Sequence, residues 1–309
     1  MPMLAALEAL IPVVALIAAG QILRRRDFPA SGFWPAADAL VYRVLFPAYL
    51  FVSAARVDLP ALRPLASATA ILLPVATVTL SLAALAAAGR LRGTTAAVLT
   101  QAAIRQNVYV AAALAVPLLG AGAAAPMALA IAISVPSVNA ISVWALTRWA
   151  PSRTPPVPVV RALLGNPLIL ASLAGIVVGS LALPLPAWLM GPLDLLAKAS
   201  LPLALLGVGA GLELALLRRP NAAMLASAVL KLAVLPALTA LACVALGIAG
   251  TLAQALVLFA ATPTSASAYV QTRLMGGDHV LMAAAITLHV VLATLTVPFV
   301  AVVVLPLLP

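Results

Sequence analysis

The sequence predicts an all-α membrane protein that crosses the bilayer ten times, as two five-helix repeats inserted in opposite directions. Of its 309 residues, 65% are hydrophobic and 8% are charged, whereas soluble domains carry about 25% charged residues. Ten apolar stretches are each close to the roughly 20 residues that a spanning helix needs. A third observation, an internal repeat, predicts how the two halves are related.

The ten expected spans are separated by connections too short to form a soluble domain. Their ranges are 4–23, 33–54, 65–88, 96–119, 124–148, 160–182, 187–212, 221–248, 252–274 and 279–306. The first span has no basic segment before it and nine more apolar segments follow, so we expect a retained helix rather than a signal peptide.

The arginines predict the orientation, because cytoplasmic loops carry an excess of basic residues. The odd-numbered connections hold Arg24, Arg25, Arg26, Arg90, Arg92, Arg148, Arg153, Arg161, Arg218, Arg219 and Arg273, and the even-numbered ones hold Arg56 and Arg63. We therefore expect a protein of the cell (inner) membrane with both termini outside the cytoplasm. The same rule accounts for the net charge of +10, so we expect no nucleic-acid partner.

Little in the sequence indicates an enzyme, a metal site or a cofactor. The single cysteine, Cys243, cannot form an internal disulfide, and the histidines are His279 and His289. Two histidines offer no metal cluster, and no Ser/His/Asp set is spaced to suggest a catalytic triad. An intramembrane enzyme would need catalytic groups that converge only in space.

Residues in the two halves match at a separation of 155 positions. The matching pairs are Pro12 and Pro167, Gly20 and Gly175, Pro29 and Pro184, Pro47 and Pro202, Met127 and Met282, and Ile131 and Ile286. Such a run indicates duplication, although similar apolar helices can also align by chance. Because five is an odd number, the second copy enters from the opposite side, which is typical of secondary transporters with a site near the bilayer midplane.

The fourth and ninth spans, equivalent in the repeat, are expected to be interrupted helices. Pro263 lacks an N–H and should break the ninth span near Thr262. The polar run 105–107 marks the corresponding place in the fourth span. Alignment of Tyr109 with Tyr269 requires a separation of 160 positions, so the register here stays open.

These two breaks provide the candidate substrate-binding residues. Two crossing breaks bring two helix N-termini together, each with about half a positive charge, and Arg105 adds a full charge, so the site favours an anion. The candidates are Arg105, Gln106, Asn107, Tyr109, Asn139, Pro263, Thr264, Ser265, Ser267 and Tyr269. Alternatively, Arg105 snorkels or forms a structural ion pair, and the hydroxyls satisfy backbone groups at a kink.

Three further polar residues within spans are candidates for ion coupling. Asp194 and Lys198 are four residues apart, so they share a helix face near the midplane and either line the substrate path or neutralise each other. His289 lies mid-span in the tenth helix and is a proton-coupling candidate, or else a structural histidine bonded to a neighbouring helix.

Four stretches resemble the auxin efflux carrier family in its compact bacterial, PIN-like form. They are "RQNVYVAAALA" (105–115), "GNPLILASLAG" (165–175), "KASLPLALLGVGAGLEL" (198–214) and "ATPTSASAYVQTRLMGGDHVLMAAAIT" (261–287). The resemblance implies a fold related to bile-acid symporters and sodium/proton antiporters. It implies a dimerising scaffold (1–62 and 155–219) and a transport domain (63–154 and 220–309) that slides as an elevator.

The resemblance also implies that the substrates are organic anions, auxin in plants and small carboxylates in bacteria. Asn107 and Pro263 match residues of the family's crossover, whereas Thr264-Ser265-Ala266-Ser267 replaces a second asparagine of plant carriers, and Gln106 and Val108 replace prolines and glycines. These departures argue against auxin itself. We therefore expect efflux of small organic anions driven by the membrane potential. The alternatives are a sodium- or proton-coupled symporter and a passive channel. The lack of paired carboxylates argues against coupling to sodium.

Overall fold

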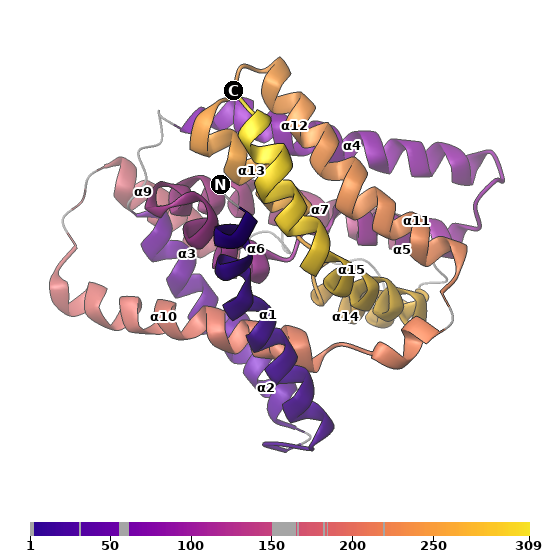
Figure 1. The fold of residues 1–309 in the computed structure, drawn as a ribbon, viewed down its shortest axis with the longest axis horizontal. Coiled ribbons are helices and arrows are strands. Elements are labelled where there is room, and N and C mark those ends of the chain that lie inside the picture. The colour runs from indigo at the N-terminus through magenta and orange to yellow at the C-terminus, as the bar shows by residue number, and fades with distance from the viewer. Residues whose placement is uncertain are drawn as a thin grey trace.

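The computed structural model describes residues 3–30, 32–55, 62–149, 165, 167–181, 183, 185–218 and 220–309. Regular structure in these residues is helical, and they contain no strand beyond one isolated bridge (Figure 1). Some residues used in the prediction lie outside the described part, namely Arg56, Arg153, Arg161, Pro184 and Arg219, as does the start of the sixth expected span at 160–164.

The described helices follow the expected spans closely. The first five spans correspond to α1 (Met3–Arg25); α2 (Phe33–Leu40), η1 (Val41–Leu45) and α3 (Phe46–Ala54); α4 (Pro64–Ala87); α5 (Gly93–Ile104) and α6 (Val108–Leu119); and η3 (Ala121–Ala123) with α7 (Ala124–Trp149). The last five correspond to α9 (Pro167–Ser180); α10 (Ala187–Ala210), followed by η4 (Leu214–Arg218); α11 (Ala222–Val229), η5 (Leu230–Val234) and α12 (Leu235–Ala245); α13 (Gly250–Ala261) and α14 (Ser267–Leu274); and α15 (His279–Phe299), η6 (Val300–Val304) and η7 (Leu305–Leu307).

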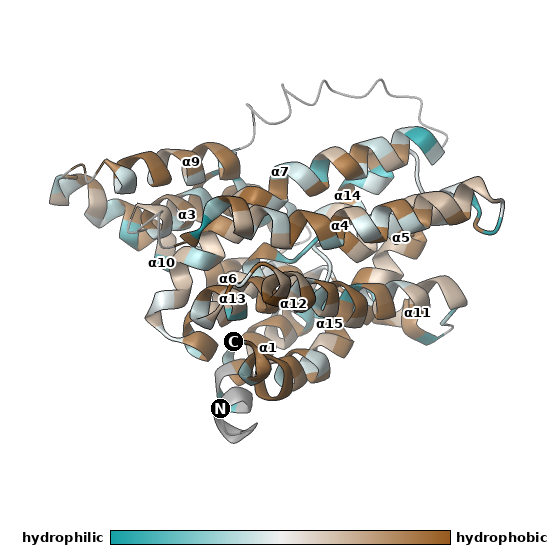
Figure 2. Ribbon diagram, turned by 90° about the horizontal axis from the view of Figure 1, so that it is seen from above, coloured by the Kyte–Doolittle hydropathy of each residue, from teal (hydrophilic) through white to brown (hydrophobic). Residues whose placement is uncertain are grey.

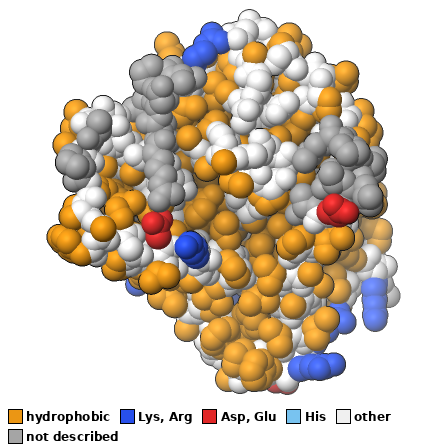
Figure 3. All heavy atoms as spheres, turned by 60° about the vertical axis from the view of Figure 1, so that its left-hand side comes forward, with side chains coloured by type: hydrophobic (Ala, Val, Ile, Leu, Met, Phe, Trp, Pro, Cys, Tyr) orange, Lys and Arg blue, Asp and Glu red, His pale blue; other side chains and the backbone are white. Residues whose placement is uncertain are grey.

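Among the described residues, six continuous helical segments are long and apolar enough to cross a bilayer: Phe33–Ala54, Pro64–Ala87, Ala121–Trp149, Ala187–Ala210, Ala222–Ala245 and His279–Leu307. Hydrophobic residues predominate along nearly every helix (Figure 2). They also predominate on the face drawn in Figure 3, where charged side chains are sparse. Large apolar side chains such as Leu65, Leu80 and Trp188 are exposed. A surface of this kind requires lipid around it, so the fold is that of a polytopic membrane protein.

Prolines disturb the regular helical hydrogen bonding in three of these spans. The π-helical turns η1, η5 and η6 each end two residues before a proline, namely Pro47, Pro236 and Pro306. Because proline has no N–H to donate, the hydrogen-bond register slips in the preceding turn. In the eighth span this π turn contains Lys231, which is completely buried.

Two glycines that match in the sequence repeat have matching contacts in the structure. Helix α1 packs against α10, and α3 packs against α9. Gly20 lies against the backbone of Leu206, and Gly175 lies against the backbone of Phe51, so closely that a Cβ atom would overlap a carbonyl oxygen in both places. The separation from Gly20 to Gly175 is 155 positions, and so is the separation from Phe51 to Leu206.

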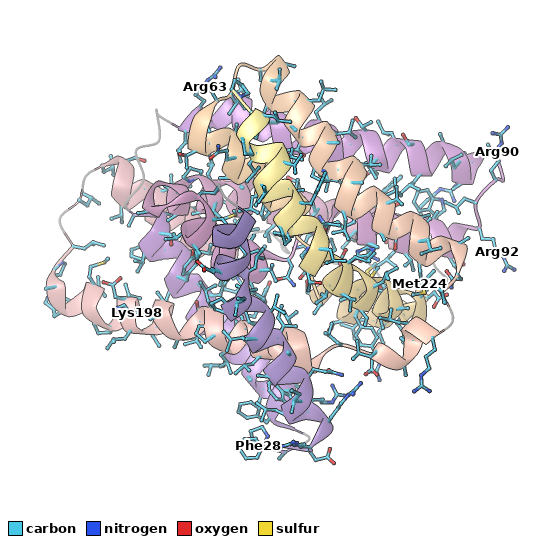
Figure 4. The ribbon with its side chains drawn as sticks, viewed as in Figure 1. Phe28, Arg63, Arg90, Arg92, Lys198 and Met224 are labelled. Atoms are coloured by element: carbon cyan, nitrogen blue, oxygen red, sulfur yellow. The ribbon has the colours of Figure 1, made fainter. Side chains whose placement is uncertain are left out.

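The connections gather at two ends of the helical body. At one end Arg24 donates to the carbonyl of Ala210 at 2.8 Å and lies 3.8 Å from Glu213. At the other end Arg63 donates to the carbonyls at the end of α12. Figure 4 shows Arg63 at the opposite end of α4 from Arg90 and Arg92. For the connections that these arginines mark, the odd-numbered and the even-numbered ones therefore lie at different ends of the helices that they join.

Candidate functional site

The breaks in the fourth and ninth spans cross and bind each other through their backbones. Helix α5 ends at Ile104 and α13 ends at Ala261. The amide of Asn107 donates to the carbonyl of Pro263 at 2.8 Å, and the amide of Ser265 donates to the carbonyl of Arg105 at 3.3 Å. Gln106 and Thr264 thereby form an isolated antiparallel bridge. Backbone groups freed inside a membrane need partners, and here each break supplies them to the other.

The residues at each break show how the helix stops. In the ninth span Pro263 ends α13 as expected, and the hydroxyl of Thr262 caps the carbonyl of Phe259 at 2.8 Å. The fourth span breaks without a central proline because Arg105 and Asn107 are extended, with ψ angles of 109° and 97°. The Asn107 side chain then starts α6 by accepting a hydrogen bond from Val110 N at 3.2 Å, as N-cap asparagines do.

The helix bounds define the register that the sequence left open. Before the breaks, α13 starts 157 positions after α5, at Gly250 and Gly93. After the breaks, α14 starts 159 positions after α6, at Ser267 and Val108. The second break therefore contains two more residues than the first. Equivalent residues in this region are therefore separated by neither 155 nor 160 positions.

Arg105 is buried at the crossing, with 7% of its surface exposed. Its guanidinium donates to the hydroxyl of Ser267 at 3.0 Å and to the side-chain oxygen of Gln271, one turn further along α14. An ion pair among the described residues joins Arg24 and Glu213. No described carboxylate forms an ion pair with Arg105. In the described part of the chain, this arginine neither snorkels to the surface nor belongs to an ion pair.

Several hydrogen-bond donors at the crossing have no partner among the described residues. Asn107 is 1% exposed and uses its side-chain oxygen as the cap, while its Nδ2 group donates to no described residue. The same holds for the backbone N–H groups that begin the two second half-helices, those of Val108, Tyr109 and Ser267. Free amides at a helix N-terminus are an anion-binding arrangement.

The neighbouring helices hold the two break residues in place. Gln106 accepts a hydrogen bond from Ser134 of α7 at 2.8 Å. Thr264 donates to the carbonyl of Ala102 at 2.5 Å and lies 2.8 Å from His289 Nδ1. The other ring nitrogen of His289 lies 3.0 Å from the hydroxyl of Ser227 on α11. His289 therefore bridges the crossing to the eighth span, as in the structural alternative considered from the sequence.

Other residues expected at the site have different contacts. Tyr109 packs edge-on against Phe46, with ring centroids 4.7 Å apart, and Tyr269 packs against His279 at 5.9 Å. Ser265 lies 3.0 Å from Ser267 and so remains near Arg105. Asn139 is half-buried on α7 and makes no hydrogen bond to a described residue of the crossing. Lys198 is exposed on α10, and Asp194 is half-buried one turn before it (Figure 4).

Sequence reasoning missed one buried charge, that of Lys231. Its ammonium donates to the carbonyl of Ala260, in the last turn of α13, at 3.1 Å. The signal was present, because a lysine in the middle of an apolar span is costly and usually has a function.

A small apolar cavity lies between α1 and the crossing. Pro263 contributes to its wall together with Val13 and Ile17 of α1 and Val110 and Leu114 of α6. Its volume of about 20 Å³ is enough for roughly one water molecule. An organic anion would need α1 and the crossing to move apart.

The comparison with protein families identifies the class. The apolar helices indicate a multi-pass membrane protein. A family model described as "Membrane transport protein" matches residues 156–301. It represents the auxin efflux carrier or PIN-like family, so residues 156–301 are similar to the family that the sequence motifs resemble. The family consists of transporters rather than enzymes. No curated protein matches the chain.

Proposed function

We propose that this protein is a secondary carrier that exports small organic anions, carboxylates in particular, across the cell (inner) membrane. The observation that carries the proposal is the pairing of two helix breaks beside an arginine that no described carboxylate neutralises. The free N–H groups that begin α6 and α14 and the amide of Asn107 would hold the carboxylate. Arg105 would supply positive potential while it fixes α14 through Ser267 and Gln271.

The charges of the chain favour an anion over a cation at this place. Its acidic residues are Glu8, Asp27, Asp38, Asp58, Asp194, Glu213 and Asp278. Only Asp278 falls in the proposed transport parts 63–154 and 220–309, and it caps the start of α15 by accepting from Leu281 N at 2.9 Å. A sodium site would have to use neutral oxygens, so sodium-coupled symport remains the less favoured alternative.

The movement we propose is an elevator. The scaffold (1–62 and 155–219) would stay fixed, and the transport parts would carry the crossing past α1. The matched contacts of Gly20 and Gly175 support two related halves, and their odd number of spans supports insertion in opposite directions. The cavity of about 20 Å³ beside α1 supports relative movement, because a carboxylate substrate does not fit while the two remain in contact.

Export would be driven by the membrane potential. An inside-negative potential pushes each negative charge outward with about 2.3 kcal/mol per 100 mV. The orientation that we propose, with both termini outside the cytoplasm, follows from the arginine distribution. A homodimer through the scaffold is the assembly we propose, since large apolar side chains of α9 and α10, such as Leu173 and Trp188, are exposed.

Equilibrium binding to the purified protein tests this proposal. Malonate, malate and indole-3-acetate are titrated into the wild type, Asn107→Ala and Asn221→Ala. Asn221 is a matched control because it also caps a helix, accepting from Met224 N at 2.9 Å, but it lies outside the crossing. We expect one of the carboxylates to bind to the wild type and to Asn221→Ala, and at least tenfold more weakly to Asn107→Ala. Equal binding to all three proteins would contradict the site.

A further inference from the structure

Lys231 is a charged side chain that the proposed function leaves without a role. It is fully buried in the π turn η5 and makes one hydrogen bond, to the carbonyl of Ala260. An ammonium group has three donors, and a buried charge without a partner is costly enough that the group either finds a counter-ion or gives up its proton.

None of the described helices packed against η5 presents an acidic residue to this ammonium. The helices packed against η5 are α5, α11, α12, α13 and α15, and none of them contains Asp or Glu. Their titratable side chains are Cys243 on α12 and His279 and His289 on α15. Arg105 follows α5, but its guanidinium is bonded to α14. A negative charge that balances the ammonium of Lys231 would therefore have to come from a bound ligand rather than from these helices.

Lys231 is connected to the crossing along two routes. The first is direct, because Ala260 is three residues before Pro263 in the same broken span. The second passes through Ser227, one helical turn before Lys231, whose hydroxyl lies 3.0 Å from His289; the other nitrogen of His289 lies 2.8 Å from Thr264 of the bridge. A charge at the crossing therefore interacts electrostatically with Lys231, because only a few groups separate them and the dielectric constant inside the protein is low.

We propose that Lys231 is a proton-binding site linked to the anion site, an inference that rests on the proposed function. With the crossing empty, the side chain is a neutral amine. An anion at the crossing supplies the missing counter-charge, and the amine then takes up one proton from water to become an ammonium. Linkage is reciprocal, so a proton on Lys231 strengthens anion binding by the factor by which the anion strengthens proton binding.

Protons would enter from a cavity close to Ser227. It has a volume of about 920 Å³ and lies at the starts of α11 and α15, where Met224 and Leu281 line it. Figure 4 shows Met224 in this region of the protein. The hydroxyl of Ser227 donates to the carbonyl of Met224 at 2.7 Å, so the wall of the cavity is one hydrogen bond from Ser227 and two from His289.

Uptake of a proton by Lys231 changes the net charge that crosses the membrane with each substrate. A proton carried with each anion cancels one negative charge. A monocarboxylate then moves without current, whereas a dicarboxylate still carries one net negative charge outward and remains driven by the membrane potential.

Calorimetry of anion binding in two buffers with different ionisation enthalpies tests the proposal, because the difference in heat gives the number of protons taken up. The probe is the carboxylate that binds the wild type most tightly. Titrations run between about pH 5 and pH 10, the range over which buried and exposed lysines titrate in proteins. We expect uptake to approach one proton per anion in part of this range.

Three variants assign the proton to its residue. Lys231→Arg retains a charge and should bind the anion without proton uptake, and Lys231→Met should bind it more weakly, again without uptake. The exposed Arg90→Met, which also removes one positive charge, is the control and should behave as the wild type does. Anion binding without proton uptake in the wild type, or uptake that persists in Lys231→Arg and disappears in His289→Gln, would overturn the assignment. If no carboxylate binds the wild type at all, the proposed function itself fails, and this inference with it.

Discussion

Gln106 and Thr264 face each other in an antiparallel bridge although they are 158 positions apart in the chain. Two backbone hydrogen bonds, of 2.8 and 3.3 Å, flank the pair. The bridge joins the two broken helices at their unwound centres, and it places Arg105, Asn107 and the starts of α6 and α14 around one point. The proposed anion site depends on this bridge, because the bridge brings its groups together.

Replacement of Arg105 by glutamine should weaken anion binding. The buried guanidinium supplies both the positive potential and two hydrogen bonds to α14. An interaction with a charged group is worth about 1.5–3 kcal/mol, so loss of the positive potential acting on the anion should raise the dissociation constant about 10- to 100-fold. The measurement is a titration with the best carboxylate, with the exposed Arg43→Gln as control. Unchanged affinity in Arg105→Gln would assign Arg105 to structure alone.

The two matched glycines should be equally intolerant of a side chain. Gly20→Ala and Gly175→Ala each place a methyl group against a backbone carbonyl of a neighbouring helix, and overpacking of this kind costs about 1–3 kcal/mol. We expect both variants to melt at lower temperature than the wild type in detergent. Gly191→Ala is the control, because a Cβ atom there meets nothing within 4 Å. Wild-type melting of only one of the two variants would contradict their equivalence.

Thr264→Val should destabilise the protein through His289. The substitution keeps the shape of the side chain and removes the hydroxyl that bonds Ala102 and the histidine ring. A buried polar group left without its partner costs about 1–3 kcal/mol. Thr239→Val is the matched control, since that buried hydroxyl bonds only the carbonyl of Leu235 in its own helix, at 2.9 Å. The melting temperature should fall further for Thr264→Val, and an equal fall would remove the special role of the His289 bridge.

The orientation predicts which cysteines are accessible in whole cells. In a Cys243→Ser background, Arg90→Cys should react with an impermeant maleimide only after the membrane is opened, because Arg90 belongs to a connection assigned to the cytoplasm. Gly247→Cys, at the end where Arg63 binds, should react in intact cells. Labelling in the reverse pattern would show that the arginine distribution has been misread.

The all-helical, membrane-spanning character of the fold was predictable because membrane spans follow from composition and length. The spans seen in the sequence agree closely with the described helices, and the break at Pro263 follows from the missing N–H. The break at 105–107 was marked only by polar residues. Its cause, an extended backbone that ends in the cap by Asn107, depends on the partner break, which supplies the carbonyl of Pro263.

The contacts of individual side chains were less predictable. Tyr109 and Tyr269 were both candidates for the substrate site, with their alignment left open, and in the structure they pack against Phe46 and His279. The direction of a side chain on a short half-helix depends on where that helix starts, and the two extra residues of the second break change that start. Lys231 contacts the site from another span, so no local motif around the crossing could have revealed it.

The most direct test of the central claim is a current measurement on proteoliposomes adsorbed to a solid-supported membrane. Concentration jumps of malonate, malate and indole-3-acetate are applied to the wild type, Asn107→Ala and Asn221→Ala, with and without sodium. We predict a saturable, sodium-independent current for at least one dicarboxylate, retained in Asn221→Ala and lost in Asn107→Ala. A current that requires sodium, or one that Asn107→Ala leaves unchanged, would contradict anion transport through the crossing of the two broken helices.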